Sequence, residues 1–404
     1  MSLLAKKKIL LGVTGGIAAY KVADWVRSMV RKEAEVTVVQ TAASTKFITP
    51  LTFAALSGKQ VYTDIFSTGP EFVVPHIDLA TNCDLLIIAP ATAATIAKLA
   101  SGMADNLLTN ISLATRSPVV IFPAMNSNMF LHHATQENLD KLRQYNYIVV
   151  PPDCGMMACN TEGPGRLPQW STAYEYISAA LCPQDLGGIR FLITAGPTHE
   201  DLDPVRFLTN RSSGKMGYSL ARAARQRGAN VVLVSGPCQL PPPPGIELIK
   251  VRSADEMYNA VQEQAATVQV IIKVAAVSDY RPSHYQKQKI KKGTKAINLP
   301  LTANEDILKT LGNIKGNNNR PILIGFAAES EKHLEAGLKK LKAKNMDLIV
   351  INDIIGQETG FAADTNKVTI IDKHGKHETL PLLSKDATAR RIIDRIVGLL
   401  PSPA

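Results

Sequence analysis

The sequence predicts an α/β protein made of two fused three-layer Rossmann-like domains. Short apolar runs, typical of buried parallel strands, alternate with helical stretches along the chain. The same pattern starts again near Ile189, and 404 residues are enough for two to three domains. No internal repeat of about 20 to 50 residues is visible, which argues against a solenoid.

Each half has its own set of strands and helices. In the first half we expect a helix over 18–31 and strands over 8–13, 35–40, 85–89, 118–122 and 148–150. In the second half we expect helices over 213–227 and 330–344 and strands over 190–194, 230–235, 246–251, 270–274, 322–325, 348–351 and 367–371. The four prolines at 241–244 predict a loop. We therefore expect domains over 1–182 and 189–404, joined by a linker over 183–188.

The composition favours a folded protein of the reducing cytoplasm. The chain is 45% hydrophobic and 20% charged, and no apolar stretch is long enough to predict a membrane span. Three lysines before an apolar run mimic an export signal, but Gly15, Gly16, Lys21 and Asp24 follow without an export boundary. Five sparse cysteines argue against a disulfide framework.

The positive charge is concentrated in the second half. Residues 1–182 carry 14 Lys and Arg against 13 Asp and Glu, whereas residues 183–404 carry 31 against 22. This excess predicts an anionic partner, for which a nucleic acid and a triphosphate are both candidates.

A glycine-containing loop follows the first predicted strand and opens the first helix. Backbone N–H groups around Gly15 and Gly16 suit a phosphate, although a purely structural turn explains such a loop as well. The loop is not a Gly-x-Gly-x-x-Gly motif, and the next strand ends in Gln40 and Thr41 without an acidic residue for a ribose. The pattern favours a mononucleotide such as FMN over NAD.

Three further segments of the first half supply polar side chains near strand ends. Thr92 and Thr95 follow one strand, Met125 and Asn126 follow another, and His76 precedes a strand by about eight residues. A surface or core imidazole and an ordinary turn residue are the alternatives for His76 and Asn126. The loop from Cys154 to Arg166 holds only two cysteines, so zinc is improbable, and a mobile lid with a working Cys159 is the alternative.

These first-half motifs together resemble the flavin-dependent phosphopantothenoylcysteine decarboxylases over about residues 5–180. The resemblance rests on the Gly15 loop, residues 89–108, Pro-Ala-Met-Asn126 and the segment after Ala158. It implies a flavodoxin-like FMN domain in which His76 is the active-site histidine, Asn126 holds the substrate carboxylate and Cys159 is the acid or reductant. Phe130 stands where the family usually has Trp. The candidate FMN contacts are Gly15, Gly16, Ile17, Ala18, Ser44, Thr92, Thr95 and Met125.

The second half has its own anion-binding pattern between a strand and a helix. Ser212, Gly214 and Lys215 stand at a predicted helix start after a long insert, although a capped helix with a long loop is the alternative. The string is not a Walker loop. Asp279 ends a further strand and suits Mg²⁺ near phosphates. Five lysines between Lys287 and Lys295 indicate either a phosphate clamp or a solvated surface.

These residues resemble the bacterial, CTP-using phosphopantothenate–cysteine ligases over about residues 189–398, and so imply a Rossmann-like ligase domain. By resemblance, Asn210 and Arg206 act on an acyl-cytidylate intermediate, and Lys289 belongs to the catalytic set. Lys273 departs from the small residue common at its position. The candidate substrate and CTP contacts are Ser212, Gly214, Lys215, Ala275, Ala276, Asp279, Lys289, Glu305, Asp306, Ile307, Leu308, Phe326, Lys340 and Lys344.

Both matches together are similar to the bifunctional proteins of coenzyme A biosynthesis. The resemblance implies FMN and Mg²⁺ as cofactors, and 4′-phosphopantothenate, L-cysteine and CTP as partners, with no nucleic acid or membrane. It also implies a homo-oligomer, with trimers through the flavin domain and dimers through the ligase domain. Two alternatives remain, an NAD(P)-dependent oxidoreductase and a basic RNA-binding protein, the second opposed by an aromatic content of 5%.

Overall fold

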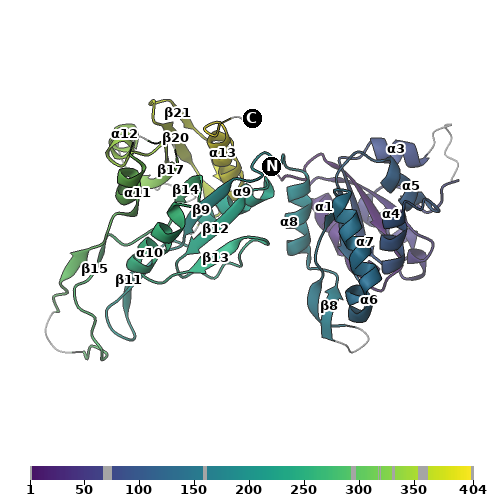
Figure 1. Cartoon of the computed structure of the whole chain (residues 1–404), viewed down its shortest axis with the longest axis horizontal. Helices are drawn as coiled ribbons and strands as arrows, with labels where there is room; N and C mark the ends of the chain where they lie inside the picture. Colours follow the sequence, from purple (N-terminus) through teal and green to yellow (C-terminus); the bar gives the residue numbers. More distant parts are fainter. Residues whose placement is uncertain are drawn as a thin grey trace. The chain divides into compact units, whose positions relative to one another are not determined.

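The chain folds into two compact units, Met1–Pro183 and Gln184–Ala404 (Figure 1). The computed structural model describes residues 2–66, 75–157, 162–292, 297–316, 318, 320–329, 333–353 and 363–401. No helix among these residues is long and apolar enough to cross a membrane.

The first unit is built on a six-stranded parallel sheet. Its strands are β1 (Lys8–Val13), β2 (Glu35–Gln40), β3 (Val61–Tyr62), β4 (Leu85–Ala91), β5 (Val119–Pro123) and β6 (Ile148–Val149). The order β3-β2-β1-β4-β5-β6 is that of a doubly wound Rossmann sheet. Successive strands are added on one side of β1 up to β3 and on its other side from β4 onwards, so the winding reverses between the parallel neighbours β1 and β4. Ligands of such sheets bind beyond the carboxyl ends of the strands at this reversal.

Helices cover both faces of this sheet, which explains why every residue of β4 is buried. One face packs against α1 (Ala19–Arg31), α2 (Pro50–Ser57) and α8 (Trp170–Ala180), and the other against α3 (Pro75–Thr81), α4 (Ala93–Ser101), α5 (Leu107–Ala114) and α7 (His133–Gln144). Short elements at the edge of the sheet are η1 (Ser44–Lys46), α6 (Ser127–Leu131) and the antiparallel pair β7 (Asp153–Met156) and β8 (Glu162–Arg166).

The second unit contains an eight-stranded sheet in the order β13-β12-β9-β14-β17-β18-β20-β21. Its parallel strands are β9 (Arg190–Ala195), β12 (Asn230–Ser235), β13 (Glu247–Lys250), β14 (Val270–Lys273), β17 (Ile322–Glu329) and β18 (Leu348–Asp353). Two strands, β20 (Val368–Asp372) and β21 (His377–Thr379), extend the sheet in the antiparallel sense. The strand order reverses between β9 and β14.

Helices also cover both faces of the second sheet. The helices α9 (Lys215–Gln226) and α13 (Lys385–Val397) share one core, while α10 (Ala254–Ala265) and α11 (Ile307–Lys315) share another. The helix α12 (His333–Ala343) packs against β18. Figure 1 shows β11 (Phe207–Thr209) and β15 (Tyr280–Pro282) on projections from the sheet, each paired with a short partner, β10 (His199–Asp201) and β16 (Leu301–Ala303).

The predicted class of two Rossmann-like α/β domains is confirmed, with small differences at element ends. The strand expected to stop before Pro90 continues to Ala91, because a shift in its pairing with β5 between Ile88 and Ala91 accommodates the proline. The helix expected from residue 213 begins at Lys215, because Gly214 adopts a left-handed conformation with φ 77°. The prolines at 241–244 lie in a loop, as expected.

Candidate active sites

The first candidate site lies where the sheet of the first unit reverses its order. Thr14, directly after β1, donates its hydroxyl to the carbonyl of Pro90 at 2.6 Å. The same hydroxyl accepts from the backbone N–H of Thr92 at 3.1 Å. These two bonds join the loop that contains Gly15 and Gly16 to the loop that contains Thr92 and therefore bring two of the predicted FMN segments together.

The helix that follows Gly16 is open to an anion at its N-terminus. The N-cap of α1 is Ala18, which cannot cap with a side chain, and Ile17 is 60% exposed. The N–H groups of Ala19 and Lys21 donate to the Gly16 and Ala18 carbonyls, and N–H groups at a helix start that lack such partners attract phosphate. A Cβ on Gly15 would approach the Cβ of Ala43 to 2.4 Å, so glycine here lets the loop containing buried Ser44 pack closely.

The loop containing Asn126 is fastened to the β7–β8 hairpin. The Met125 N–H donates to the Gly165 carbonyl at 3.0 Å, and the Ser127 hydroxyl donates to the Pro164 carbonyl at 2.8 Å. Asn126 itself accepts from the Asn128 N–H and caps α6. Residues 158–161, which include the predicted catalytic Cys159, lie outside the described residues. The described strands that flank them nevertheless place the hairpin beside Asn126.

His76 lies in the first turn of α3 and is half-buried. Its Nδ1 is buried and lacks a hydrogen-bond partner among the described residues, which do not include 67–74 immediately before the helix. Thr92 caps α4 by accepting from the Thr95 N–H, and the two hydroxyls lie 3.2 Å apart. The carboxyl edge of the first sheet thus carries the hydroxyls of Thr14, Thr92 and Thr95 and the amide of Asn126.

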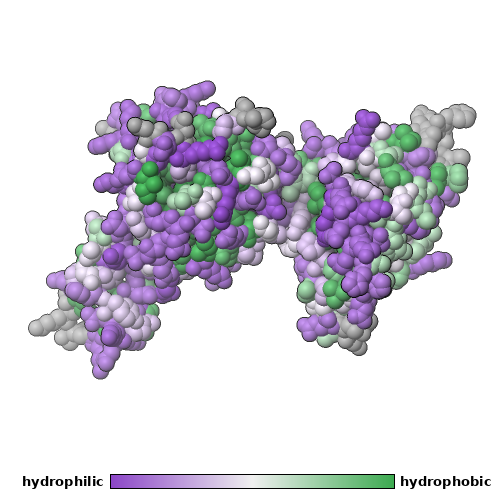
Figure 2. Space-filling view, in the orientation of Figure 1, coloured by the Kyte–Doolittle hydropathy of each residue, from purple (hydrophilic) through white to green (hydrophobic). Residues whose placement is uncertain are grey.

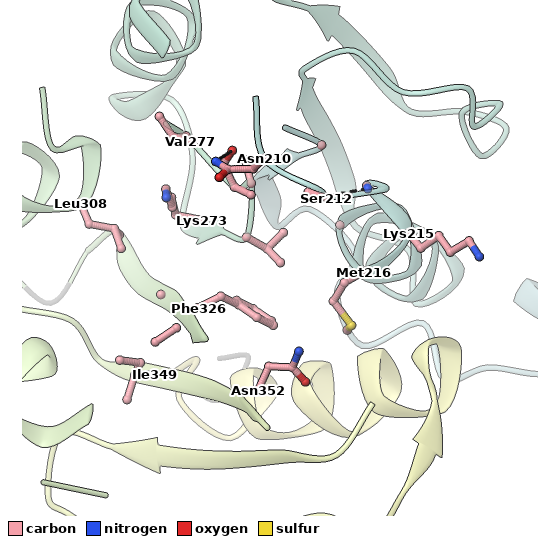
Figure 3. A pocket seen from close by; sticks show the side chains of 18 of the residues that line it. Asn210, Ser212, Lys215, Met216, Lys273, Val277, Leu308, Phe326, Ile349 and Asn352 are labelled. Carbon is pink, nitrogen blue, oxygen red and sulfur yellow. Dashed lines mark hydrogen bonds between the residues drawn. The ribbon is translucent and has the colours of Figure 1, made fainter. Parts of the chain in front are cut away.

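The second candidate site is a cavity of about 360 Å³ at the reversal between β9 and β14 (Figure 3). Loops after β9 and β14, the start of α9, and residues of β17, β18 and α12 form its walls. Of the residues predicted from sequence, eleven line it: Asn210, Ser212, Gly214, Lys215, Ala275, Ala276, Asp279, Leu308, Phe326, Lys340 and Lys344.

Hydrogen bonds between the loops after β9 and β14 fix one wall of this cavity. The buried Thr194 hydroxyl accepts from the N–H groups of Val274 and Ala275, both at 3.1 Å. The Ala276 N–H donates to the Gly196 carbonyl at 3.0 Å, and the Asn210 side-chain amide donates to the Ala276 carbonyl at 2.9 Å. Asn210 is thereby held over the end of β14.

The start of α9 presents a second anion-binding helix end. A Cβ on Gly217 would approach the Cβ of Ala195 to 2.6 Å, so glycine allows the first turn to pack directly on β9. Gly214, at the N-cap, makes no side-chain cap, and its N–H donates to the Ser212 hydroxyl at 3.4 Å. The first turn therefore faces the cavity with backbone N–H groups.

The side chains of Lys273, Lys340 and Lys344 also line this cavity. The Lys344 ammonium pairs with Asp306 at 2.7 Å. Burial would raise the pKa of Asp306, but the bond from Lys344 and the Lys309 N–H hold that pKa below its usual value. Lys273, at the end of β14, has its pKa lowered to about 8 by burial and by the nearby charge of Lys344.

Arg206 and Lys289 lie on the projecting segments and are not among the described residues that line the cavity. The buried Asp203 carboxylate accepts from the N–H groups of Arg206 at 2.8 Å and Ile290 at 3.0 Å. Burial would raise the Asp203 pKa, but these N–H donors keep that pKa low. The Arg206 guanidinium in turn donates to the Ile290 carbonyl at 2.9 Å, so the lysine-rich segment is docked beside Arg206.

Some predicted residues do not line the cavity, and some residues that line it were not predicted. Glu305 is exposed and Ile307 is buried at the start of α11, and neither lines the cavity. Sequence reasoning missed Asn352, Asn366 and Lys385, which line the cavity from distant parts of the chain. Asn352 directly follows the predicted strand over residues 348–351, and this position was a usable signal. For Asn366 and Lys385, nothing local in the sequence pointed to the cavity.

Comparison with known proteins identifies the family. The chain matches the family described as Flavoprotein over residues 2–181 and that described as DNA/pantothenate metabolism flavoprotein C-terminal domain over residues 186–400. Coenzyme A biosynthesis bifunctional protein CoaBC of Vibrio cholerae is 46% identical over 98% of this chain and 99% of that protein. Its namesake from Bacillus subtilis is 44% identical over 98% of each.

A solved structure described as the C-terminal domain of such a CoaBC protein is 44% identical, covers 54% of this chain and 97% of that chain, and gives a TM-score of 0.46. The matches to the two full-length relatives decide the assignment. The chain belongs to the family of coenzyme A biosynthesis bifunctional proteins.

Proposed function

We propose that this chain catalyses two successive steps of coenzyme A biosynthesis. The second unit joins 4′-phosphopantothenate to L-cysteine at the expense of CTP, and the first unit decarboxylates the product to 4′-phosphopantetheine. The observation that carries the proposal is the lysine-rich cavity at the β9–β14 reversal, in a chain similar over its full length to bifunctional relatives. Residues 1–182 and 189–404 would be the two catalytic domains, and 183–188 their linker.

The first unit has the features that FMN requires. The uncapped start of α1 suits its single phosphate, and β2 ends in a buried Gln40 rather than an acid for a second ribose. Gly15, Gly16, Ile17, Ala18, Ser44, Thr92, Thr95 and Met125 would hold it. When bound, FMN supplies an electron sink that makes loss of CO2 from a cysteine carboxylate possible.

The protein's own residues would position the decarboxylation substrate. Asn126 would hold the departing carboxylate through its side-chain amide, which its place at the α6 N-cap orients. The buried Nδ1 of His76 has no hydrogen-bond partner among the described residues and would be available to bind substrate or cofactor. Cys159 would supply the proton that completes the product. The β7–β8 hairpin supports this role, because its described part packs against the Asn126 loop.

The ligase reaction requires activation of a carboxylate, whose oxygen is a poor leaving group. Attack of the 4′-phosphopantothenate carboxylate on the α-phosphorus of CTP forms an acyl cytidylate and releases pyrophosphate. The cysteine amine then attacks the acyl carbon and expels CMP. Lys340, Lys344 and the start of α9 would stabilise the phosphate charge, and Lys289 would close over it. Asn210 and Arg206 would act on the cytidylate.

Magnesium is part of the proposal through CTP. Asp279 lines the cavity and is exposed, so its carboxylate could bind a cation carried by the phosphates. The described residues contain no group of three or more His, Cys, Asp or Glu side chains that could hold a metal ion. This favours a cation bound partly by the nucleotide itself.

Self-association and a cytoplasmic location complete the proposal. Large apolar side chains reach the surface of the first unit, including Ile17, Leu51 at 76% exposure and Ile77. Figure 2 shows hydrophobic surface around α3 and α5, in contrast to the hydrophilic surface over α7. Such patches support self-association of the flavin unit; trimers through this unit and dimers through the ligase unit rest on family resemblance. None of the four described cysteines forms a disulfide, in keeping with a reducing compartment.

The two alternative functions are not favoured. An NAD(P)-dependent oxidoreductase does not explain the second-unit cavity or the full-length similarity to bifunctional relatives. An RNA-binding protein would need exposed aromatic stacking surfaces on a sheet, whereas the described strands of both central sheets are covered by helices.

Two separate measurements test the proposal, one for each unit. Purified protein, reconstituted with FMN, should show an oxidised-flavin absorption spectrum. With 4′-phosphopantothenate and without cysteine, it should release pyrophosphate from CTP in preference to UTP. Protein that neither takes up FMN nor consumes CTP would contradict both assignments.

A further inference from the structure

Lys273 is a cavity residue that neither the family pattern nor the proposed chemistry uses. It is the last residue of β14, and its half-buried side chain lines the cavity together with Lys340 and Lys344. Figure 3 shows this side chain between Leu308 and Asn210, on the same side of the cavity as Val277.

The Lys273 ammonium has no counter-ion at contact distance among the described residues. Of the two carboxylates that influence it, Asp306 is engaged by Lys344 at 2.7 Å and Asp279 is exposed to solvent. A shielded cation without a partner is unfavourable in the free protein, because burial removes its water. Consistently, burial and Lys344 lower the pKa of Lys273 to about 8.

A polyanionic ligand would supply the missing negative charge. An ammonium offers three hydrogen-bond donors and serves as a point charge for phosphate oxygens. We propose that Lys273 is a further anion-binding lysine of this cavity and contacts the phosphate chain of the nucleotide together with Lys340 and Lys344. The inference rests on the proposed use of CTP, and adds a phosphate contact where the family commonly has a small residue.

One competing role is proton transfer from the incoming cysteine ammonium to a neutral Lys273. The two roles require opposite protonation states. Arginine keeps a positive charge and phosphate-binding donors but cannot act as a base near neutral pH. Lys273→Arg therefore separates them: it preserves nucleotide affinity if Lys273 binds phosphate and abolishes cysteine-dependent turnover if Lys273 is a base.

The experiment measures dissociation constants of the full-length protein for CTP, CDP and CMP by calorimetry at pH 7. The variants are Lys273→Met, Lys273→Arg and Lys339→Met; Lys339 is an exposed α12 lysine outside the cavity lining and serves as the matched control. Loss of one charge-assisted contact should weaken CTP binding about 10- to 100-fold in Lys273→Met. The loss should shrink for CDP and again for CMP, while Lys273→Arg and Lys339→Met stay near wild type.

Thermal melting of the ligand-free proteins separates a binding role from a structural one. Removing an unpartnered, shielded cation should raise the melting temperature of Lys273→Met, although the same change weakens CTP binding. A structural role predicts a lower melting temperature instead.

Three results would overturn the inference: unchanged CTP affinity in Lys273→Met, an equal loss for CTP and CMP, or a lowered melting temperature that accounts for weaker binding. If the wild-type protein binds no CTP, the proposed function fails as well, and the inference fails with it.

Discussion

The backbone N–H of Met125 donates to the carbonyl of Gly165 at 3.0 Å, which joins the Asn126 loop to the β7–β8 hairpin. Gly165 has φ +144°, and a Cβ there would stand 2.1 Å from the Met125 carbonyl oxygen. Only glycine permits this approach. The contact couples the predicted carboxylate-binding residue to the hairpin that leads into Cys159.

Gly165→Ala should therefore separate the two activities. We expect decarboxylation to fall by about 100-fold or more, since a displacement of about 1 Å can cost that much, while CTP-dependent ligation is unchanged. The control is Gly58→Ala, where φ is also positive at +67° but a Cβ would meet nothing within 4 Å. Both activities should survive that change. Equal decarboxylase activity in Gly165→Ala and Gly58→Ala would refute the coupling.

Cys159→Ala should stop the decarboxylase after CO2 has left. We expect release of CO2 without matching formation of 4′-phosphopantetheine, because the oxidised enethiol product is not protonated and reduced. Mass spectrometry of the products checks this, with Cys154→Ala as the control from the described part of the same hairpin. Full conversion by Cys159→Ala would remove the residue from the mechanism.

Asn210→Asp should allow formation of the acyl cytidylate but impair its consumption. The aspartate cannot donate to the Ala276 carbonyl, which Asn210 contacts at 2.9 Å, and it adds negative charge beside the intermediate. Acid-quenched samples with and without cysteine should show more cytidylate in the variant than in wild type when cysteine is present. Equal accumulation in the two proteins would count against this role.

Lys289→Gln should mainly slow formation of the cytidylate. The lysine belongs to the segment that Asp203 and Arg206 dock through Ile290, so its charge can be delivered to the phosphates. Pyrophosphate release without cysteine should fall roughly 10- to 100-fold, as expected for one charge-assisted contact. Lys250→Gln, at the exposed end of β13, is the control. A normal pyrophosphate burst with slow CMP release would contradict the assignment.

The pKa of Lys273 predicts a pH-dependent stability difference. This pKa falls from 10.5 to about 8, because burial and Lys344 outweigh the opposing effects of Asp306 and Asp279. The unfolded chain thus holds the proton more tightly, and the unfolding free energy of wild type rises between about pH 8 and 10.5. Ligand-free Lys273→Met should be more stable at pH 7 by up to roughly 3 kcal/mol. In denaturant unfolding at several pH values, the difference in unfolding free energy between Lys273→Met and wild type should shrink toward pH 10. A difference that stays constant with pH would contradict the lowered pKa of Lys273.

Much of the fold could be predicted from the sequence, because buried parallel strands appear as continuous apolar runs. The strand over residues 230–235 was predicted with its observed ends, and the prediction for β4 omitted only Pro90 and Ala91. The short pairs β10–β11 and β15–β16 were not predicted, since strands of three residues are too short to carry a periodic apolar signal.

The candidate sites were predicted unevenly for a related reason. Asn210 and Ala276 follow strand ends, and the topology of a parallel sheet brings such ends together. Asn366, in the short strand β19 (Thr365–Asn366), and Lys385, at the start of α13, reach the same cavity from the C-terminal part of the chain, whose position depends on long-range packing. The docking of Arg206 on Ile290 is likewise a contact between residues 84 positions apart.

The most direct test of the account is a single incubation of the FMN-reconstituted protein with 4′-phosphopantothenate, L-cysteine and CTP. CMP, CO2 and 4′-phosphopantetheine are measured together over time. The account predicts that CMP appears first and that CO2 and 4′-phosphopantetheine then rise in equal amounts, with all three dependent on CTP. Formation of CMP without any CO2, or of CO2 without CTP, would contradict the claim that one chain makes the cysteine adduct and then decarboxylates it.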